Sequence, residues 1–239
     1  MEGRVVTRSS PGRGVNWPRA LLFDLDGTLI DSVPDLANAV NELLAGDALP
    51  PQSLDAVRAM IGNGVRKLVE RAYRAAGQAL DSHALDAATD RMMGIYGRHL
   101  TNRTVLMPGA REMVVAYHMA GVRIAVVTNK PEAFTREILS HFGLQSHVHA
   151  VVGGDTGPAR KPAPDMLLHA LKQLRTGTGN AVMVGDSPAD IDAAKAAGIA
   201  GFAVRGGYTT VPVDNLGADR VISSLMELPA ALDAFRVSA

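Results

Sequence analysis

Short apolar runs recur along the chain, and each one is bounded by glycine, proline or a polar residue. The clearest are residues 20–23, 124–127, 148–152, 181–184, 202–204 and 220–222. Most of them lack the alternation of apolar and polar residues that marks a half-exposed strand. Continuous apolar runs are typical of strands buried on both faces of a parallel sheet. The pattern therefore predicts six buried strands.

Helical patterns lie between these runs. Residues 110–120, 132–142 and 189–197 are each followed or closed by a glycine, at positions 121, 143 and 198. Glycine directly after the last helical turn ends a helix, because it accepts the left-handed backbone conformation there. Strands that alternate with helices predict a doubly wound, mostly parallel, Rossmann-like α/β sheet.

Residues 32–104 break the alternation because they contain no strand-like run. Four helices are expected there instead, over residues 35–44, 54–60, 66–76 and 84–99. Roughly 70 residues are too many for one crossover connection. We therefore expect a disordered N-terminal arm over residues 1–18, an α/β core over 19–33 and 105–239, and a small inserted helical cap over 34–104.

Composition and charge narrow the choice of partners. The chain has 24 Lys and Arg against 24 Asp and Glu, so no global basic field exists to hold nucleic acid or an acidic membrane. The absence of cysteine excludes a disulfide scaffold, a Cys-ligated zinc site and a thiol nucleophile. No apolar run has the length of a secretory signal or a membrane span. We expect a cytoplasmic protein, and any positive charge that meets an anion must be local.

Polar clusters follow several of the predicted strands. They comprise residues 24–28 (DLDGT), 128–130 (TNK), 185–187 (GDS) and, just ahead of a further helix, 160–162 (RKP). Ligands of a parallel sheet of this kind bind outside the carboxyl ends of the strands. The four clusters are therefore expected to converge on one edge of the sheet.

Three aspartates in this set create an electrostatic problem. Two unit charges 4 Å apart repel by about 4 kcal/mol at an effective dielectric of 20. Asp24, Asp26 and Asp186 would raise one another's pKa values unless a cation neutralised them. Oxygen ligands without His or Cys favour Mg²⁺. The sequence therefore predicts a Mg²⁺ site formed by these three residues.

The same clusters carry a family resemblance. Residues 24–29 (DLDGTL), 128–129 (TN), 161–162 (KP) and 185–190 (GDSPAD) resemble the four ordered motifs of the haloacid dehalogenase superfamily of phosphotransferases. The resemblance covers nearly the whole chain beyond Pro18, including the helical insertion. Residues 29–32, 62–69, 127–131 and 161–165 are similar to the phosphoglycolate phosphatase group. Residues 205–208 (RGGY) fit that group only in part.

The resemblance implies a Mg²⁺-dependent phosphoric monoester hydrolase that acts on a small phosphorylated metabolite, with 2-phosphoglycolate as the first candidate. It implies that Asp24 attacks phosphorus and forms an aspartyl-phosphate. Asp26 would protonate the leaving group and then activate water, which requires a raised pKa. The metal would be held by Asp24, Asp186 and the backbone carbonyl of Asp26.

Five further residues receive roles on this basis. Thr128 and Asn129 would donate hydrogen bonds to phosphate oxygens. Lys161, placed just before a helix, would offset the charge on the nucleophile and on phosphate. Asp190 would orient Lys161 or metal-bound water. Arg66, in the expected cap, is a candidate for a substrate carboxylate, because the guanidinium fork matches carboxylate geometry.

Several alternatives stay open at this stage. The substrate is open between phosphoglycolate and another sugar or amino-sugar phosphate, and a phosphomutase would share all four motifs. A dehalogenase needs neither Asp26 nor a metal, so Asp26 and the acidic cluster argue against it. A non-enzymatic phospho-acceptor module needs neither a cap nor a general acid at Asp26, so these features argue against that class as well. The expected partner is a small-molecule phosphate monoester, with neither nucleic acid nor a membrane, and the chain is expected to be a monomer or a homodimer.

Overall fold

The computed structural model describes residues 17–237 and contains a six-stranded sheet in which every neighbouring pair of strands is parallel. The strand order is β5-β4-β1-β6-β7-β8. The strands are β1 (Ala20–Phe23), β4 (Arg123–Val127), β5 (Ala150–Val152), β6 (Ala181–Gly185), β7 (Ala200–Val204) and β8 (Arg220–Ile222). All six predicted strands are thus confirmed. Strand order reverses at β1, which places a ligand crevice beyond its carboxyl end.

Helices cover both faces of this sheet. They are α5 (Ala110–Met119), α6 (Glu132–His141), α7 (Asp165–Gln173), α8 (Pro188–Ala197) and α9 (Leu228–Val237), with short 3-10 turns at 145–147, 178–180, 213–215 and 225–227. Leu21 and Phe23 of β1 pack in one hydrophobic cluster with α5, α6 and α9, whereas Ala20 and Leu22 pack with α7 and α8 in another. The period of two along a strand explains this division, since successive side chains point to opposite faces.

Glycines end three of these helices, as the sequence predicted. Gly121, Gly143 and Gly198 have φ values of +77°, +63° and +68°. The doubly wound α/β architecture is confirmed. Among the described residues, no helix combines the length and the apolar character that crossing a membrane requires.

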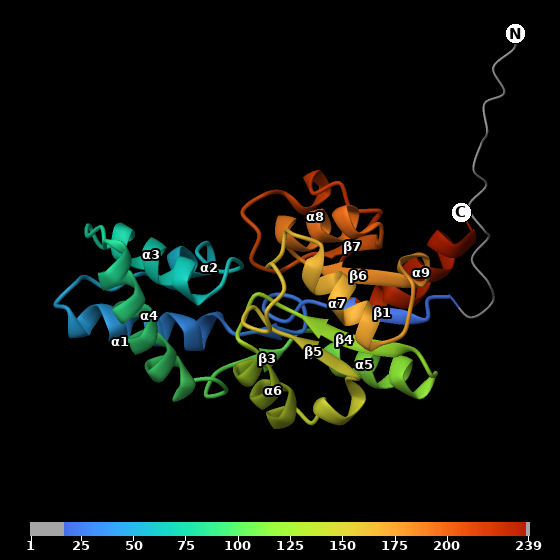
Figure 1. Cartoon of the computed structure of the whole chain (residues 1–239), viewed down its shortest axis with the longest axis horizontal. Helices are drawn as coiled ribbons and strands as arrows, with labels where there is room; N and C mark the ends of the chain where they lie inside the picture. Colours follow the sequence, from blue (N-terminus) through green and yellow to red (C-terminus); the bar gives the residue numbers. More distant parts are fainter. Residues whose placement is uncertain (1–16, 238–239) are drawn as a thin grey trace, which may run out of the picture.

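Four helices lie to one side of the sheet, on the left of Figure 1. They are α1 (Val33–Gly46), α2 (Leu54–Arg58), α3 (Val65–Ala75) and α4 (Ser82–Gly97), here called the helical segment. They begin and end within a few residues of the predicted helices. The chain enters and leaves this segment through β2 (Ile30–Asp31) and β3 (Val105–Leu106), a short antiparallel pair. Two-residue strands leave too little pattern to predict, so this pair was missed.

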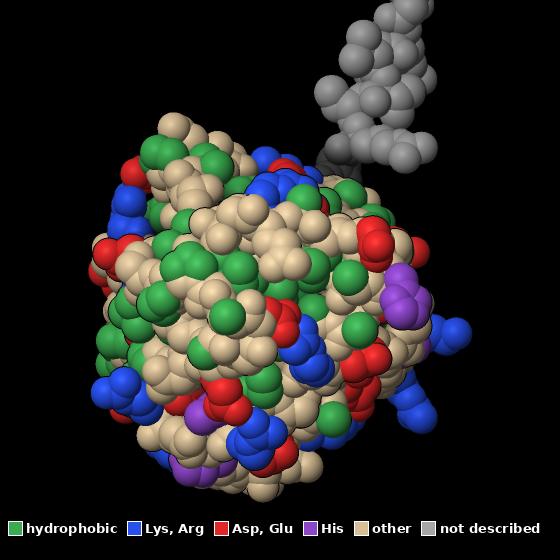
Figure 2. Space-filling model, turned by 90° about the vertical axis from the view of Figure 1, so that its left-hand side faces the viewer, with side chains coloured by type: hydrophobic (Ala, Val, Ile, Leu, Met, Phe, Trp, Pro, Cys, Tyr) green, Lys and Arg blue, Asp and Glu red, His purple; other side chains and the backbone are tan. Residues whose placement is uncertain are grey.

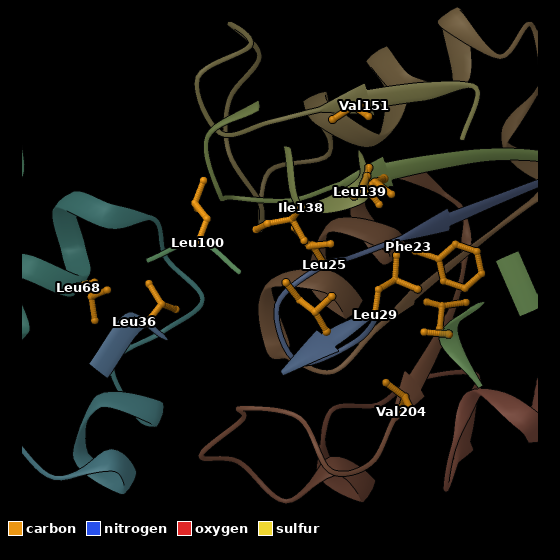
Figure 3. Packing of buried hydrophobic residues seen from close by; sticks show 14 of the residues in the cluster. Phe23, Leu25, Leu29, Leu36, Leu68, Leu100, Ile138, Leu139, Val151 and Val204 are labelled. Carbon is orange, nitrogen blue, oxygen red and sulfur yellow. The ribbon is translucent and has the colours of Figure 1, made fainter. Parts of the chain in front are cut away.

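The helical segment and the sheet share buried apolar contacts. One hydrophobic cluster contains Leu36 and Leu68 of the helical segment together with Leu25 and Leu29 beyond β1 (Figure 3). This continuous packing holds the helical segment over the carboxyl end of β1.

The predicted N-terminal arm, residues 1–18, lies outside the described residues up to position 16. Trp17 is buried, and its indole N–H donates to the carbonyl of Gly179 at 3.1 Å. The last two residues of the predicted arm therefore pack against the core.

Candidate active site

The chain turns sharply where β1 ends, directly after Phe23. The N–H of Asp24 donates to the carbonyl of Val184 in β6 at 3.0 Å, so the first acid of the turn is still held by the sheet. Gly27 has a φ of +89°, and a Cβ added there would lie 2.6 Å from Oδ2 of Asp186. A left-handed backbone and a close approach both favour glycine at this position. The turn therefore brings the acids after β1 and β6 together.

A cavity of about 60 Å³ opens at this end of the sheet. Its lining from the core includes Asp24, Asp26, Thr128, Asn129, Lys130, Lys161, Asp186 and Asp190, and its lining from the helical segment includes Ile61, Gly62, Gly64, Val65, Leu68 and Tyr96. The four polar clusters that were predicted to converge thus meet in one cavity. One water needs roughly 10–15 Å³ on this scale, so the cavity suits a small ligand.

Lys161 lies at the centre of the charged groups. Its Nζ donates to Asp24 Oδ1 at 2.7 Å, to Asp190 Oδ1 at 2.6 Å and to the carbonyl of Val127 at 2.7 Å. Burial by itself lowers the pKa of Lys161, but the carboxylates of Asp190 and Asp24 more than offset this and hold that pKa above its ordinary value. All three ammonium hydrogens are therefore used within the protein.

Burial disfavours the ionised forms of Asp24 and Asp186. Burial raises the pKa of Asp24 to about 7, although Lys161 works in the opposite direction. Burial also raises the pKa of Asp186 well above its ordinary value, and the charges of Asp190 and Asp24 add to the effect. Asp186 accepts hydrogen bonds from the N–H of Tyr208 and the hydroxyl of Thr28. Within residues 17–237, however, it forms no ion pair. When Asp186 is ionised, its negative charge has no positively charged partner within residues 17–237.

This cluster fits a hard divalent cation. Carboxylate oxygens of Asp24, Asp186 and Asp190 all lie within 4.8 Å of one another. Asp190 is already occupied, because Oδ1 accepts from Lys161 and Oδ2 accepts from the N–H and hydroxyl of Ser187. Asp24 and Asp186 are therefore the carboxylates left to hold a metal, and oxygen-only ligands suit Mg²⁺.

The side chain of Asp26 lies outside the group formed by Asp24, Asp186 and Asp190, although it lines the same cavity. It accepts from the hydroxyl of Ser32 at 2.5 Å and from Lys130 Nζ at 3.0 and 3.1 Å. Lys130 is buried and also donates to the Tyr96 hydroxyl at 2.7 Å. The Asp26 side chain is therefore engaged by Ser32 and Lys130, and a metal contact through its backbone carbonyl stays a prediction.

Comparison with known proteins shows the family. The model of haloacid dehalogenase-like hydrolases matches residues 18–198. The chain is a haloacid dehalogenase-like hydrolase. It is 39% identical over 211 residues to a phosphoglycolate phosphatase from Caulobacter vibrioides, which is 88% of this chain and 89% of that one. It is also 40% identical over 215 residues to a phosphoglycolate phosphatase from Rhodospirillum rubrum, again 88% and 89%.

Solved structures agree with this family. A "predicted phosphoglycolate phosphatase" from Haemophilus somnus 129PT superposes with a TM-score of 0.85 at 31% identity, covering 91% of this chain and 99% of that one. CbbY from Rhodobacter sphaeroides, in complex with phosphate, gives a TM-score of 0.77 at 26% identity, covering 90% and 99%. The family resemblance inferred from the motifs is confirmed.

Thr128 and Asn129, the two residues expected to donate hydrogen bonds to phosphate, differ in whether their donor hydrogens are already used within the protein. The Thr128 hydroxyl oxygen accepts from the N–H of Lys130 at 3.3 Å, which leaves its proton available to a ligand. Both amide hydrogens of Asn129 are used, because Nδ2 donates to the carbonyls of Gly62 and Lys161 at 2.9 and 3.0 Å. Asn129 Oδ1 is buried without a partner among the described residues. Asn129 therefore joins the helical segment to the core in this structure.

Arg66 is not brought to the cavity. Its guanidinium donates to Asp86 at 2.8 Å and to Ser82 at 3.1 Å on α4, and 45% of its side chain is exposed. It lines a separate surface hollow between α3 and α4. In this structure Arg66 therefore lies outside the cavity at which we expected it to meet a substrate carboxylate.

Sequence reasoning missed the residues that hold Asp26. Lys130 carried a signal, since it directly follows Thr128 and Asn129 in a cluster at a strand end. Ser32 belongs to the run 29–32 that resembles phosphoglycolate phosphatases, but that run did not indicate a contact with Asp26. Tyr96 carried no signal, because its role depends on how the helical segment lies on the core.

Proposed function

We propose that this hydrolase is a Mg²⁺-dependent phosphomonoesterase that cleaves a small phosphorylated acid, 2-phosphoglycolate first among them, through an aspartyl-phosphate on Asp24. The observation that carries the proposal is the state of the Asp24 carboxylate. Oδ1 is held by Lys161 at 2.7 Å, while Oδ2 accepts no hydrogen bond from residues 17–237. One oxygen is fixed and the other is left to attack.

In the first step, Oδ2 of Asp24 forms a bond to phosphorus as the bond from phosphorus to the ester oxygen breaks. Asp26, in its protonated form, gives its proton to the departing alkoxide, which leaves as the free alcohol. For 2-phosphoglycolate that alcohol is glycolate. The carboxylate nucleophile divides a very slow hydrolysis into two easier steps.

In the second step, Asp26 accepts a proton from water as the water oxygen bonds to phosphorus and the bond to Asp24 breaks. Inorganic phosphate leaves, and both aspartates return to their starting states. Thr128 supports both steps by donating its free hydroxyl proton to a phosphate oxygen. Lys161, tied to Asp24 and Asp190, keeps the nucleophile aligned and reduces its repulsion from the phosphate.

Asp24, Asp186 and the carbonyl of Asp26 would hold Mg²⁺, which when bound neutralises charge on the phosphate and on these acids. Glycines fit this assignment. A Cβ at Gly27 or Gly207 would lie 2.6 or 2.2 Å from Asp186 Oδ2, so the two glycines let the backbone pack closely against that carboxylate. Asp190 orients Lys161 in this scheme and takes no metal contact.

Size and position of the cavity favour a small substrate. We propose that residues 34–104 form a cap over a core of residues 19–33 and 105–239. Gly62, Gly64 and Val65 of the cap line the cavity at the N-terminus of α3.

The first turn of α3 suits a substrate carboxylate. It carries no acidic residue, and Gly64 provides no side-chain cap, so the N–H groups at the start of α3 can bind an anion. Relatives named phosphoglycolate phosphatases, 39–40% identical to this chain, support the same substrate.

Release of inorganic phosphate from a substrate panel tests the proposal. The panel comprises 2-phosphoglycolate, an amino-sugar phosphate, a hexose phosphate with and without a bisphosphate activator, and p-nitrophenyl phosphate. We expect the highest kcat/KM on 2-phosphoglycolate and complete loss with a chelator, restored by Mg²⁺. Phosphoryl transfer that needs a bisphosphate would identify a phosphomutase, and a stable phosphoprotein without turnover would contradict the proposal. The cytoplasmic location and the monomeric or homodimeric state stay predictions.

A further inference from the structure

The segment 205–208 (RGGY), which follows β7, lies directly on the acidic cluster. The N–H of Tyr208 donates to Asp186 Oδ2 at 2.7 Å. A Cβ added at Gly207 would lie 2.2 Å from the same oxygen, closer than any side chain tolerates. The backbone of this segment therefore helps to fix the carboxylate of Asp186.

The side chain of Tyr208 reaches from there to the junction between the core and the helical segment. It is 7% exposed and lines the cavity. Its hydroxyl oxygen accepts from the N–H of Ser32 at 2.7 Å, and its hydroxyl hydrogen is donated to Asp31 Oδ1 at 2.8 Å. Ser32 is fully buried and precedes α1 directly. The Tyr208 hydroxyl thus supplies the partner that a buried N–H requires.

Ser32 in turn holds Asp26. Its hydroxyl donates to Asp26 Oδ1 at 2.5 Å. A continuous set of hydrogen bonds therefore runs from Asp186 through Tyr208 and Ser32 to Asp26. Lys130 contacts both oxygens of Asp26 at 3.0 and 3.1 Å. Lys130 therefore contacts the two oxygens alike, whereas the Ser32 hydroxyl contacts Oδ1 alone and so distinguishes the two oxygens.

We propose that Tyr208 is a positioning residue that aligns Asp26 for proton transfer to the leaving group, acting through Ser32. The proposal rests on the proposed function, in which Asp26 is the proton donor. A proton donor must lie within hydrogen-bond reach of the atom it protonates. Loss of the Tyr208 hydroxyl removes the partner of the Ser32 N–H, and a displacement of about 1 Å in a catalytic group costs on the order of 100-fold in rate.

The test compares Tyr208→Phe with the wild-type enzyme on two leaving groups. An alkyl phosphate such as 2-phosphoglycolate needs a proton on its departing oxygen, and p-nitrophenyl phosphate hardly does. We expect kcat/KM for the alkyl phosphate to fall about 10-fold or more, within the share that general acid catalysis supplies. We expect kcat/KM for p-nitrophenyl phosphate to stay within about twofold, because kcat/KM reports the first step, in which this leaving group hardly needs a proton, and leaves out the second step, in which Asp26 activates water for both substrates.

Mg²⁺ dependence gives a second readout of the same variant. Asp186 is held by the backbone N–H of Tyr208, which Phe retains. The Mg²⁺ concentration that gives half-maximal activity is therefore expected to stay within about twofold. A large rise would mean that the hydroxyl supports the metal site instead, and it would overturn the proposal.

Tyr73→Phe is the matched control. Tyr73 is buried as Tyr208 is, and its hydroxyl also donates to an aspartate, Asp47, but it lies within the helical segment and does not line the cavity. Its ratio of the two kcat/KM values should equal that of the wild type. Ser32→Ala should reproduce the Tyr208→Phe ratio, and the double variant should add little, because both changes break one connection.

Each remaining result has one meaning. Equal losses on the two substrates in Tyr208→Phe would indicate a merely structural role and overturn the proposal, as would no loss on either. A wild-type enzyme that releases phosphate from neither substrate would overturn the proposed function, and this inference with it. An active wild type with an unchanged Tyr208→Phe ratio would overturn this inference alone.

Discussion

Two aspartates show how differently one side chain behaves in the two parts of the molecule. Asp24 lies at the buried end of β1, where burial outweighs the help of Lys161 and raises its pKa to about 7. Asp47 lies just after α1 with 28% of its side chain exposed, and hydrogen bonds from Arg91 and Tyr73 lower its pKa to about 2. The two shifts lie on opposite sides of the ordinary value of 3.8.

The opposite shifts have opposite consequences for stability. The folded-state pKa of Asp24 is higher than in the unfolded chain, so its ionisation costs stability as the pH rises from about 4 to 7. The pKa of Asp47 is lowered by folding, so its contribution is present above about pH 4 and is lost as the pH falls towards 2. The site therefore carries negative charge that a bound cation would neutralise, whereas the acids of the helical segment that form ion pairs already have basic partners. Figure 2, which views the molecule from the side of the helical segment, shows acidic and basic side chains interspersed on that face.

The largest expected effect comes from Asp24→Asn. We expect kcat to fall by about three orders of magnitude or more, because the nucleophile is lost. In metal-free protein at pH 8 the melting temperature should rise above that of the wild type, because the costly ionisation is removed. Phosphate release and thermal denaturation measure the two effects.

The pH dependence provides the control for that variant. At pH 4 the wild-type carboxyl is protonated, so the difference in melting temperature between the two proteins should disappear. An Asp24→Asn protein with native turnover would contradict the assignment of the nucleophile.

Lys161→Met should have the next largest effect, this time on folding. It leaves Asp24 and Asp190 buried without their shared cation, which costs about 3–5 kcal/mol. Urea unfolding at pH 7.5 measures the loss. Lys67→Met is the matched control, since the Lys67–Glu70 pair is partly exposed, and it should cost about 1 kcal/mol or less. Equal losses in the two variants would remove the distinction between buried and exposed pairs.

Mg²⁺ should stabilise the wild-type protein in a pH-dependent way. At about 100 times its dissociation constant the gain is about 2.7 kcal/mol, or roughly 5–10 °C in melting temperature for a chain of this size. Raised pKa values of Asp24 and Asp186 mean that protons compete with the metal at low pH. The gain should therefore be larger at pH 8 than at pH 5.5. Scanning calorimetry with Mg²⁺ and with chelator tests this, and an equal gain at both pH values would contradict it.

Arg91→Gln tests the other half of the comparison. Arg91 donates to both oxygens of Asp47 at 2.8 and 2.7 Å but is about half exposed. The expected loss of stability is about 1 kcal/mol or less, with kcat unchanged. A loss as large as that of Lys161→Met would show that exposure does not decide the strength of these pairs.

The smallest effect is expected from Arg66→Ala. The Arg66–Asp86 pair is exposed, so stability should change by about 1 kcal/mol or less. KM for 2-phosphoglycolate should stay within about twofold, since the guanidinium lies away from the cavity. A tenfold rise in KM would instead bring Arg66 back as the group that recognises the substrate carboxylate.

The sequence by itself determined the parts of this protein that depend on local pattern. Strand positions followed from apolar runs, helix ends from glycines, and the convergence of residues 24–28, 128–130, 160–162 and 185–187 from the rule that parallel strands end at one edge. Those features were predictable because backbone hydrogen bonding and burial act on neighbouring residues and leave a period in the sequence.

Only the tertiary structure decided which partners the polar side chains at that edge of the sheet contact. It assigned both amide hydrogens of Asn129 to carbonyls, turned Arg66 towards Asp86, and joined Tyr208 to Ser32 across 176 positions of the chain. Such contacts depend on how the helical segment packs against the sheet. Apolar surfaces determine that packing, and their sequence pattern does not indicate which polar atoms the packing brings together. The acids of the site were therefore predictable from sequence, whereas the residues that hold them in place were not.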